Sequence, residues 1–70
     1  MSKVIATRHV QRNITFLTDK AADYYEQAKS YERQGFEALA NWYEGRAAAF
    51  SAAAEYMQTD LDIFAEEVEA

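Results

Sequence analysis

The sequence contains no cysteine and no proline, and its 70 residues include only two glycines and one histidine. Without cysteine, the chain can form neither a disulfide framework nor a zinc site built on thiolates. Without proline, long helices can run uninterrupted. A chain of fewer than about 80 residues gains little stability from its own core and usually needs disulfides, a metal or oligomerisation. The sequence therefore favours an oligomer.

Long hydrophobic runs are also absent. No segment approaches the roughly 18 apolar residues that would indicate a transmembrane helix. The first residues, MSKVIATRHVQRN, contain no continuous apolar region of the kind found in a signal peptide. Half of the residues are nevertheless hydrophobic, which is typical of a globular chain rather than a disordered one. We therefore expect a cytoplasmic protein that has no membrane partner.

Charge is unevenly distributed along the chain, whose formal net charge is −5. Residues 1–18 contain basic residues and no acid, whereas no base follows Arg46 and acids accumulate toward the C-terminus. In an antiparallel hairpin the basic start would lie beside the acidic end. We then expect Arg8 and Arg12 to neutralise acids such as Asp60 and Asp62, with a greater effect on orientation than on stability.

An apolar residue recurs every three or four positions in both halves of the chain, which predicts two helices that pack along a seam. The first set of seam residues is Val10, Ile14, Leu17, Ala21, Tyr24, Ala28 and Tyr31. The second set is Phe36, Ala40, Tyr43, Ala47, Phe50, Ala54, Met57, Leu61, Phe64 and Val68. Gly35 separates the two sets, and glycine readily takes the left-handed conformation that ends a helix.

These features predict an all-α fold, a two-helix antiparallel hairpin forming one domain over residues 1–70. Helix one is expected over about 3–34 and helix two over about 36–68, with the turn at Gly35. Large and small seam residues face each other when each pair of residue numbers adds up to 71: Tyr31 with Ala40, Ala28 with Tyr43, Tyr24 with Ala47, Ala21 with Phe50, and Leu17 with Ala54. Layers of one large and one small side chain fill such a seam without voids.

The N-terminal segment admits a second interpretation. Residues 3–16 are rich in β-branched and aromatic side chains, which suit a strand as well as a helix. Asn13 or Thr18 could cap a helix that starts later. Val10 and Ile14 continue the downstream repeat, and for that reason we favour a helix over a β-like arm.

A second line of apolar residues lies one position before the seam of helix two, and we name it the apolar stripe. Its members are Leu39, Trp42, Ala49, Ala53, Tyr56 and Ile63, with Arg46 and Asp60 interrupting the line. A lone hairpin would leave it exposed, whereas two copies related by a two-fold axis could cover it in a four-helix bundle. We therefore predict a homodimer whose interface includes the stripe and Arg46.

The same residues allow another interpretation, in which part of the stripe docks a different protein. Trp, Tyr and Arg dominate binding hot spots, and Trp42, Tyr43 and Arg46 lie within about one helical turn. Other residues outside the seam could contact such a partner, namely Phe16, Tyr25, Arg8 and Arg12.

No pattern of catalytic or metal-binding residues stands out. His9 is the only histidine, and no Glu-x-x-His or His-Glu-x-x-His motif is present. The C-terminal acids lack the glycine turn and the ligand order of a calcium loop. A nucleophilic site would need His9 with Ser30 or Ser51, and neither serine would lie near it in the hairpin. We therefore expect no enzymatic activity, no cofactor and no metal.

The sequence favours a small acidic regulator or inhibitor that binds another protein as a helical homodimer. Its size and acidity are similar to those of small regulators carried by bacteria and their phages. The antiparallel large-and-small bundle also resembles the architecture of the repressor of primer family, small acidic dimers that bind paired RNA loops. That resemblance implies RNA contacts at Lys3, Arg8, Arg12 and Asn13, although the net charge opposes phosphate binding. In a further alternative the acidic end mimics nucleic acid.

Overall fold

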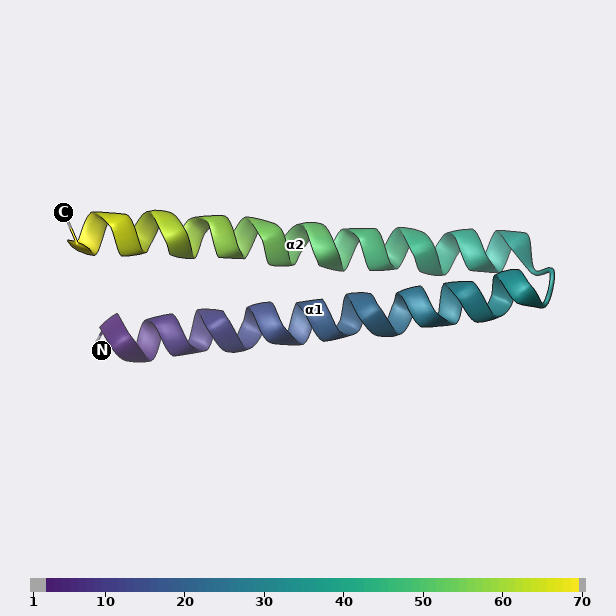
Figure 1. Ribbon diagram of the computed structural model, residues 1–70, viewed down its shortest axis with the longest axis horizontal. Helices are drawn as coiled ribbons and strands as arrows, with labels where there is room; N and C mark the ends of the chain where they lie inside the picture. The colour runs from purple at the N-terminus through teal and green to yellow at the C-terminus, as the bar shows by residue number, and fades with distance from the viewer. Residues whose placement is uncertain (1–2, 70) are drawn as a thin grey trace.

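The protein is a hairpin of two long antiparallel helices, as the sequence predicts (Figure 1). The computed structural model describes residues 3–69, and the side chains of residues 7–65. Helix α1 spans Lys3–Arg33 and helix α2 spans Glu37–Glu69. The start of α1 and the end of α2 lie at one end of the hairpin, and the turn lies at the other (Figure 1). The all-helical class is thus confirmed, since residues 3–69 contain no strand.

The turn between the helices is a Schellman motif. The amide of Phe36 donates to the carbonyl of Tyr31 at 2.9 Å, and the amide of Gly35 donates to the carbonyl of Glu32 at 3.0 Å. Gly35 has a φ of 86°, in the left-handed region that this motif requires after the last helical turn. The two hydrogen bonds satisfy carbonyl groups that the end of α1 would otherwise leave unpaired. Gly35 therefore reverses the chain as predicted.

Phe36 belongs to this turn and not to the second helix. Helix α2 begins at Glu37, one residue later than expected, and the carbonyl of Phe36 accepts the hydrogen bond of Ala40. The Phe36 ring meets the Tyr31 ring edge to face, with centroids 6.3 Å apart. A Schellman motif commonly carries an apolar contact between these two positions. Phe36 remains 55% exposed, so it closes the turn and adds little to the seam.

The N-terminal segment is helical, so the β-like arm is wrong for residues 3–16. The Thr18 hydroxyl, a candidate cap, instead donates back to the carbonyl of Ile14 at 2.8 Å within the helix. Thr15 makes the same kind of bond to Gln11. Ile14 is 9% exposed and lies in the seam, and its burial shows that tertiary contacts override local β propensity here.

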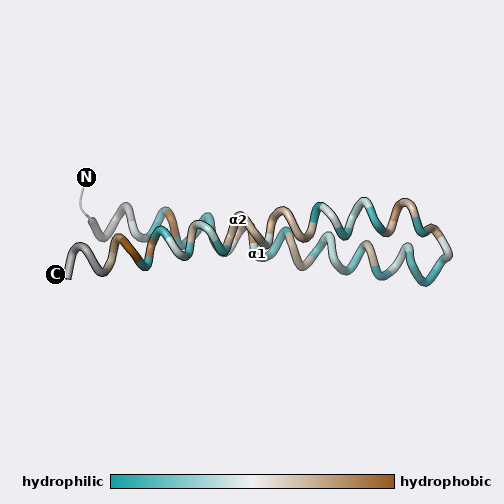
Figure 2. The backbone as a smooth tube through the Cα atoms, turned by 90° about the horizontal axis from the view of Figure 1, so that it is seen from above, coloured by the Kyte–Doolittle hydropathy of each residue, from teal (hydrophilic) through white to brown (hydrophobic). Residues whose placement is uncertain are grey.

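The seam follows the predicted alternation of large and small side chains. Four of the five predicted small positions are buried, namely Ala28, Ala40, Ala47 and Ala54. The large rings form a ladder that alternates between the helices, with centroids 5.3 Å apart for Tyr31 and Tyr43, 5.8 Å for Tyr43 and Tyr24, and 5.4 Å for Tyr24 and Phe50. The two helices cross when seen from above (Figure 2), as expected for helices that share a 3.5-residue repeat.

The hairpin is too slender to bury its larger side chains. It measures 52 × 17 × 13 Å, and its radius of gyration is 15.9 Å, against about 11 Å for a compact chain of this length. Among the described side chains, no large one is fully buried. The accessible surface is 5422 Å², whereas a compact monomer of this mass would expose about 4450 Å². About 1000 Å² more surface is exposed than a compact fold would leave.

Candidate interaction surface

The apolar stripe lies along the outer flank of α2 and is largely exposed. The exposed fractions of its large members are 41% for Leu39, 53% for Trp42, 74% for Tyr56 and 50% for Ile63. Ala49 is exposed and Ala53 is half-buried. The hairpin therefore leaves this line of side chains without cover, as the sequence led us to expect for a single copy.

Trp42 contacts one aromatic ring and one guanidinium group. Its ring meets the Tyr43 ring edge to face at 4.9 Å, and the Arg46 guanidinium lies 5.0 Å from the centre of its ring. The same guanidinium lies 5.9 Å from the Tyr24 ring, so Arg46 links the stripe to the seam. Cation–π contacts of this kind contribute about 0.5–1 kcal/mol at exposed sites. A shallow hollow beside Trp42 is lined by Ala38, Leu39, Trp42 and Tyr43.

The opposite side of the hairpin carries a groove with a floor of small residues. Ala21 and Ala47 lie between walls from the two helices, and the lining also includes Thr18, Ala22, Tyr25, Glu44, Ala48 and Ser51. Glu44 and Ser51 flank the seam of α2 on the side away from the apolar stripe. We call the two sides of the hairpin the groove side and the stripe side.

The two predicted aromatic contacts of α1 fall on different sides. Tyr25 lines the groove, so it cannot extend the surface of the apolar stripe. Phe16 precedes the seam residue Leu17, and in an antiparallel pair the flanks that precede the seam face the same way. Phe16 therefore lies on the stripe side. Both rings are close to a lysine, with Lys20 5.8 Å from the Phe16 ring and Lys29 4.7 Å from the Tyr25 ring.

These cation–π contacts share a sequence signal that the analysis of apolar spacing missed. Each lysine or arginine follows its ring by four positions, as in Phe16 with Lys20, Tyr25 with Lys29, and Trp42 with Arg46. Residues four apart lie on the same face of a helix. Arg46 interrupts the apolar stripe in sequence, yet in space it covers part of its largest member.

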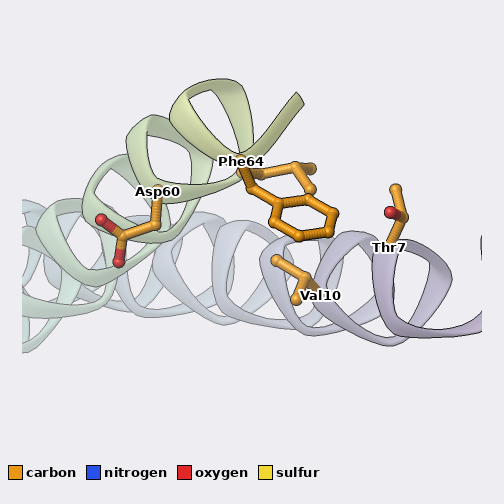
Figure 3. Close-up of a pocket in the computed structure, with 5 residues that line it drawn as sticks. Thr7, Val10, Asp60 and Phe64 are labelled. Carbon is orange, nitrogen blue, oxygen red and sulfur yellow. The ribbon is translucent and has the colours of Figure 1, made fainter. Parts of the chain in front are cut away.

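The open end of the hairpin has an apolar hollow between the helices (Figure 3). It is lined by Thr7, Val10, Asp60, Leu61 and Phe64, and the Phe64 ring points toward Val10. The Asp60 carboxylate is turned away from both apolar side chains (Figure 3). The hollow has a volume of about 250 Å³, slightly below the range of about 300–1000 Å³ typical of small-molecule sites. We interpret it as the loosely filled end of the seam.

The predicted charge pairing at this end stays a prediction. Arg8, Arg12, Asp60 and Asp62 are all exposed. Asp62 accepts a hydrogen bond of 3.0 Å from Gln58 of its own helix.

The residues considered for nucleophilic chemistry lie far apart. His9 and Ser30 are separated by about 31 Å along α1, from the rise of about 1.5 Å per residue. The register of the seam places His9 level with residue 62 of α2, so Ser51 lies about 16 Å away along the axis. Within the described part of the chain, no group of three or more His, Asp or Glu side chains could hold a metal ion. The described helices include none that is long and apolar enough to cross a membrane.

One titratable group in the seam is perturbed. Desolvation raises the pKa of the Tyr43 phenol above its usual value of 10.0, and the nearby phenols of Tyr31 and Tyr24 raise it further. The packed seam therefore favours the neutral form of Tyr43, so ionisation of this phenol at high pH should weaken the packing of the ring ladder.

Comparison of the chain with protein-family models, with curated proteins and with solved structures found no match.

Proposed function

We propose that this chain is a non-enzymatic, acidic protein-binding regulator or inhibitor that acts as a homodimer, in which two hairpins associate through the apolar stripe. The observation that carries the proposal is the exposed stripe on a hairpin with no fully buried large side chain among those described. The excess surface of about 1000 Å² exceeds the roughly 800 Å² that each partner contributes to a standard interface. A second copy would therefore remove most of the excess surface.

The composition of α1 shapes the expected bundle. On the stripe side, α1 presents mainly polar side chains, including Asn13, Lys20, Asp23 and Gln27, together with Phe16. An α1–α1′ contact would therefore bury little apolar surface, whereas an α2–α2′ contact would bury the whole stripe. We propose a four-helix assembly with the two α2 helices at its centre and the α1 helices on the outside.

The groove side remains open in such a dimer and is the surface that we propose for a different protein. Tyr25 stands at one wall of the groove, and its ring contacts the Lys29 ammonium. Alanines on the floor allow the backbone of another helix to approach closely. Glu44 and Ser51 supply polar groups on the facing wall.

The mass of the protein in solution tests the homodimer. Sedimentation equilibrium of the wild type is expected to give twice the chain mass of 8.0 kDa. Trp42→Ala removes about 2 kcal/mol of interface energy from each copy, so the dissociation constant should rise by about three orders of magnitude. Tyr25→Ala is a matched control, because Tyr25 is 47% exposed and lies on the groove side. If Trp42→Ala remained dimeric, Trp42 would lie outside the dimer interface. That result would contradict a dimer formed through the stripe and would favour a role of Trp42 in binding a different protein.

Capture from a bacterial lysate tests the kind of partner. The dimer is expected to retain its bound protein after RNase treatment, and to lose it when Tyr25→Ala alters the groove side. The variant Arg8→Ala/Arg12→Ala should capture the same protein. If RNA were recovered with the wild type and lost with the double arginine variant, the protein-binding proposal would be overturned in favour of RNA binding.

A further inference from the structure

We propose a specific register for the homodimer: the two α2 helices pack antiparallel about a two-fold axis level with Ser51, so that each pair of facing residues adds up to 102. This inference rests on the homodimer of the proposed function and goes beyond it by naming the contacts. The facing pairs are Leu39 with Ile63, Trp42 with Asp60, Arg46 with Tyr56, and Ala49 with Ala53.

The spacing of the stripe alone permits this register, and the chemistry of the pairs favours it. Arg46 and Asp60, the two charged interruptions, would each meet an aromatic side chain that suits them. An arginine guanidinium binds the face of a tyrosine ring, and an indole N–H is a hydrogen-bond donor suited to a carboxylate. Arg46 and Asp60, which interrupt the stripe, would then form the specific contacts of the interface.

Arg46 and the partner's Tyr56 form the first kind of pair. The Arg46 guanidinium already lies 5.0 Å from the centre of its own Trp42 ring. In the proposed register the guanidinium also meets the ring of the partner's Tyr56. Tyr56 is 74% exposed in a single copy, the largest fraction among the exposed large apolar side chains described. This contact explains why such a ring projects from the hairpin.

Trp42 and the partner's Asp60 form the second kind of pair. The Asp60 carboxylate is turned away from the apolar hollow at the open end (Figure 3). Asp60 flanks the seam on the stripe side, so its carboxylate can accept a hydrogen bond from the indole of a second copy. Between the two polar pairs, Ala49 and Ala53 allow the helices to approach toward the short end of the 8–10 Å range.

Competing registers leave part of the stripe uncovered. A shift of one heptad in one direction leaves Asp60 and Ile63 facing no residue of the stripe, and the opposite shift leaves Leu39 and Trp42 facing none. A parallel arrangement would place each residue beside its own copy. Arg46 would then meet Arg46 and Asp60 would meet Asp60, and such like-charge contacts are unfavourable. In the antiparallel arrangement the dipoles of the two α2 helices point in opposite directions, which is electrostatically favourable.

Disulfide trapping tests the register directly, because the native chain has no cysteine. In the variant Leu39→Cys/Ile63→Cys the two positions lie about 36 Å apart within one helix, so a disulfide can form only between copies. We expect a covalent dimer as the main product of mild oxidation. Both positions are at least 41% exposed in the hairpin, so the substitutions should leave its fold intact.

Three control variants represent the alternatives. Leu39→Cys alone would crosslink only in a parallel dimer, Leu39→Cys/Tyr56→Cys in one shifted register, and Arg46→Cys/Ile63→Cys in the other. Preferential crosslinking of any control would overturn the proposed register while leaving the homodimer standing. A dimeric wild type with no crosslink in any variant would also overturn it. A monomeric wild type would overturn the proposed function as well, so the two failures are distinguishable.

Discussion

The seam and the apolar stripe of α2 share one spacing but have opposite surroundings. The seam pairs rings with alanines across two helices of the same chain, and its small positions Ala40, Ala47 and Ala54 are buried. The stripe has rings and alanines at similar intervals, yet Trp42 and Tyr56 remain more than half exposed. The seam is completed within one chain, whereas the stripe is not. The difference shows that the same spacing can produce a face that is packed within the chain and a face that remains exposed.

Truncating one ring in each region gives the largest expected contrast. In a Trp42→Ala background that is monomeric, Tyr24→Ala should lower the free energy of unfolding by about 2–3 kcal/mol, because it removes the central ring of the ladder. Tyr56→Ala in the same background should change it by less than about 0.5 kcal/mol. Urea denaturation followed by circular dichroism measures both values. Equal losses would contradict the distinction between seam and stripe.

The two glycines allow a second comparison. Gly35 lies in the turn that creates the seam, whereas Gly45 lies outside both the seam and the stripe. Gly35→Ala should destabilise the hairpin by about 1–2 kcal/mol, because an alanine is strained at a φ of 86°. Gly45→Ala should stabilise it by about 0.8–1 kcal/mol, because Gly45 lies inside α2 and its replacement improves helix propensity.

Thermal unfolding of both glycine variants measures these opposite effects. At either glycine, an added Cβ would meet no atom within 4 Å, so backbone conformation and not crowding should set the sign of each change. A loss of stability in Gly45→Ala would show that this face of α2 is also in contact with something.

High pH offers a smaller perturbation, of which the ionisation of Tyr43 acts on the seam. The pKa of Tyr43 is raised in the folded state, so the unfolded chain releases this proton at a lower pH than the folded chain. The resulting stabilisation should be fully present below pH 10 and should decrease as the pH rises above it. Urea denaturation across this range measures the effect. In the Trp42→Ala background, Tyr43→Phe should reduce the dependence more than Tyr56→Phe, which alters the exposed stripe.

The sequence predicted the hairpin well because its strongest signals were long and mutually consistent. The repeat from Val10 to Tyr31 and its continuation after Gly35 required two packed helices, and propensity alone could not decide residues 3–16. The burial of Ile14 resolved that ambiguity in favour of the helix. The role of Phe36 was not predicted, because the 3.5-residue spacing cannot distinguish the first seam residue of a helix from the last residue of a turn.

Less of the candidate surface was predictable. The stripe was identified from spacing, but Tyr25 was not assigned to the groove side, although it follows its seam residue Tyr24 whereas the stripe precedes the seam of α2. Nor did apolar spacing reveal the contact of Arg46 with Trp42 and Tyr24. A search for basic residues four positions after aromatic ones would have found the first of these contacts, whereas the second joins two helices.

The Schellman turn at Gly35 also has a kinetic consequence. Tyr31 and Ala40 are nine positions apart in the chain, whereas Val10 and Leu61 are 51 positions apart. Each successive layer therefore closes a longer loop than the one before, and the entropy lost on closure grows with that length. We therefore expect the helices to pack first next to the Gly35 turn and then progressively further from it. Thermal unfolding should begin at the opposite end of the hairpin and advance toward Gly35.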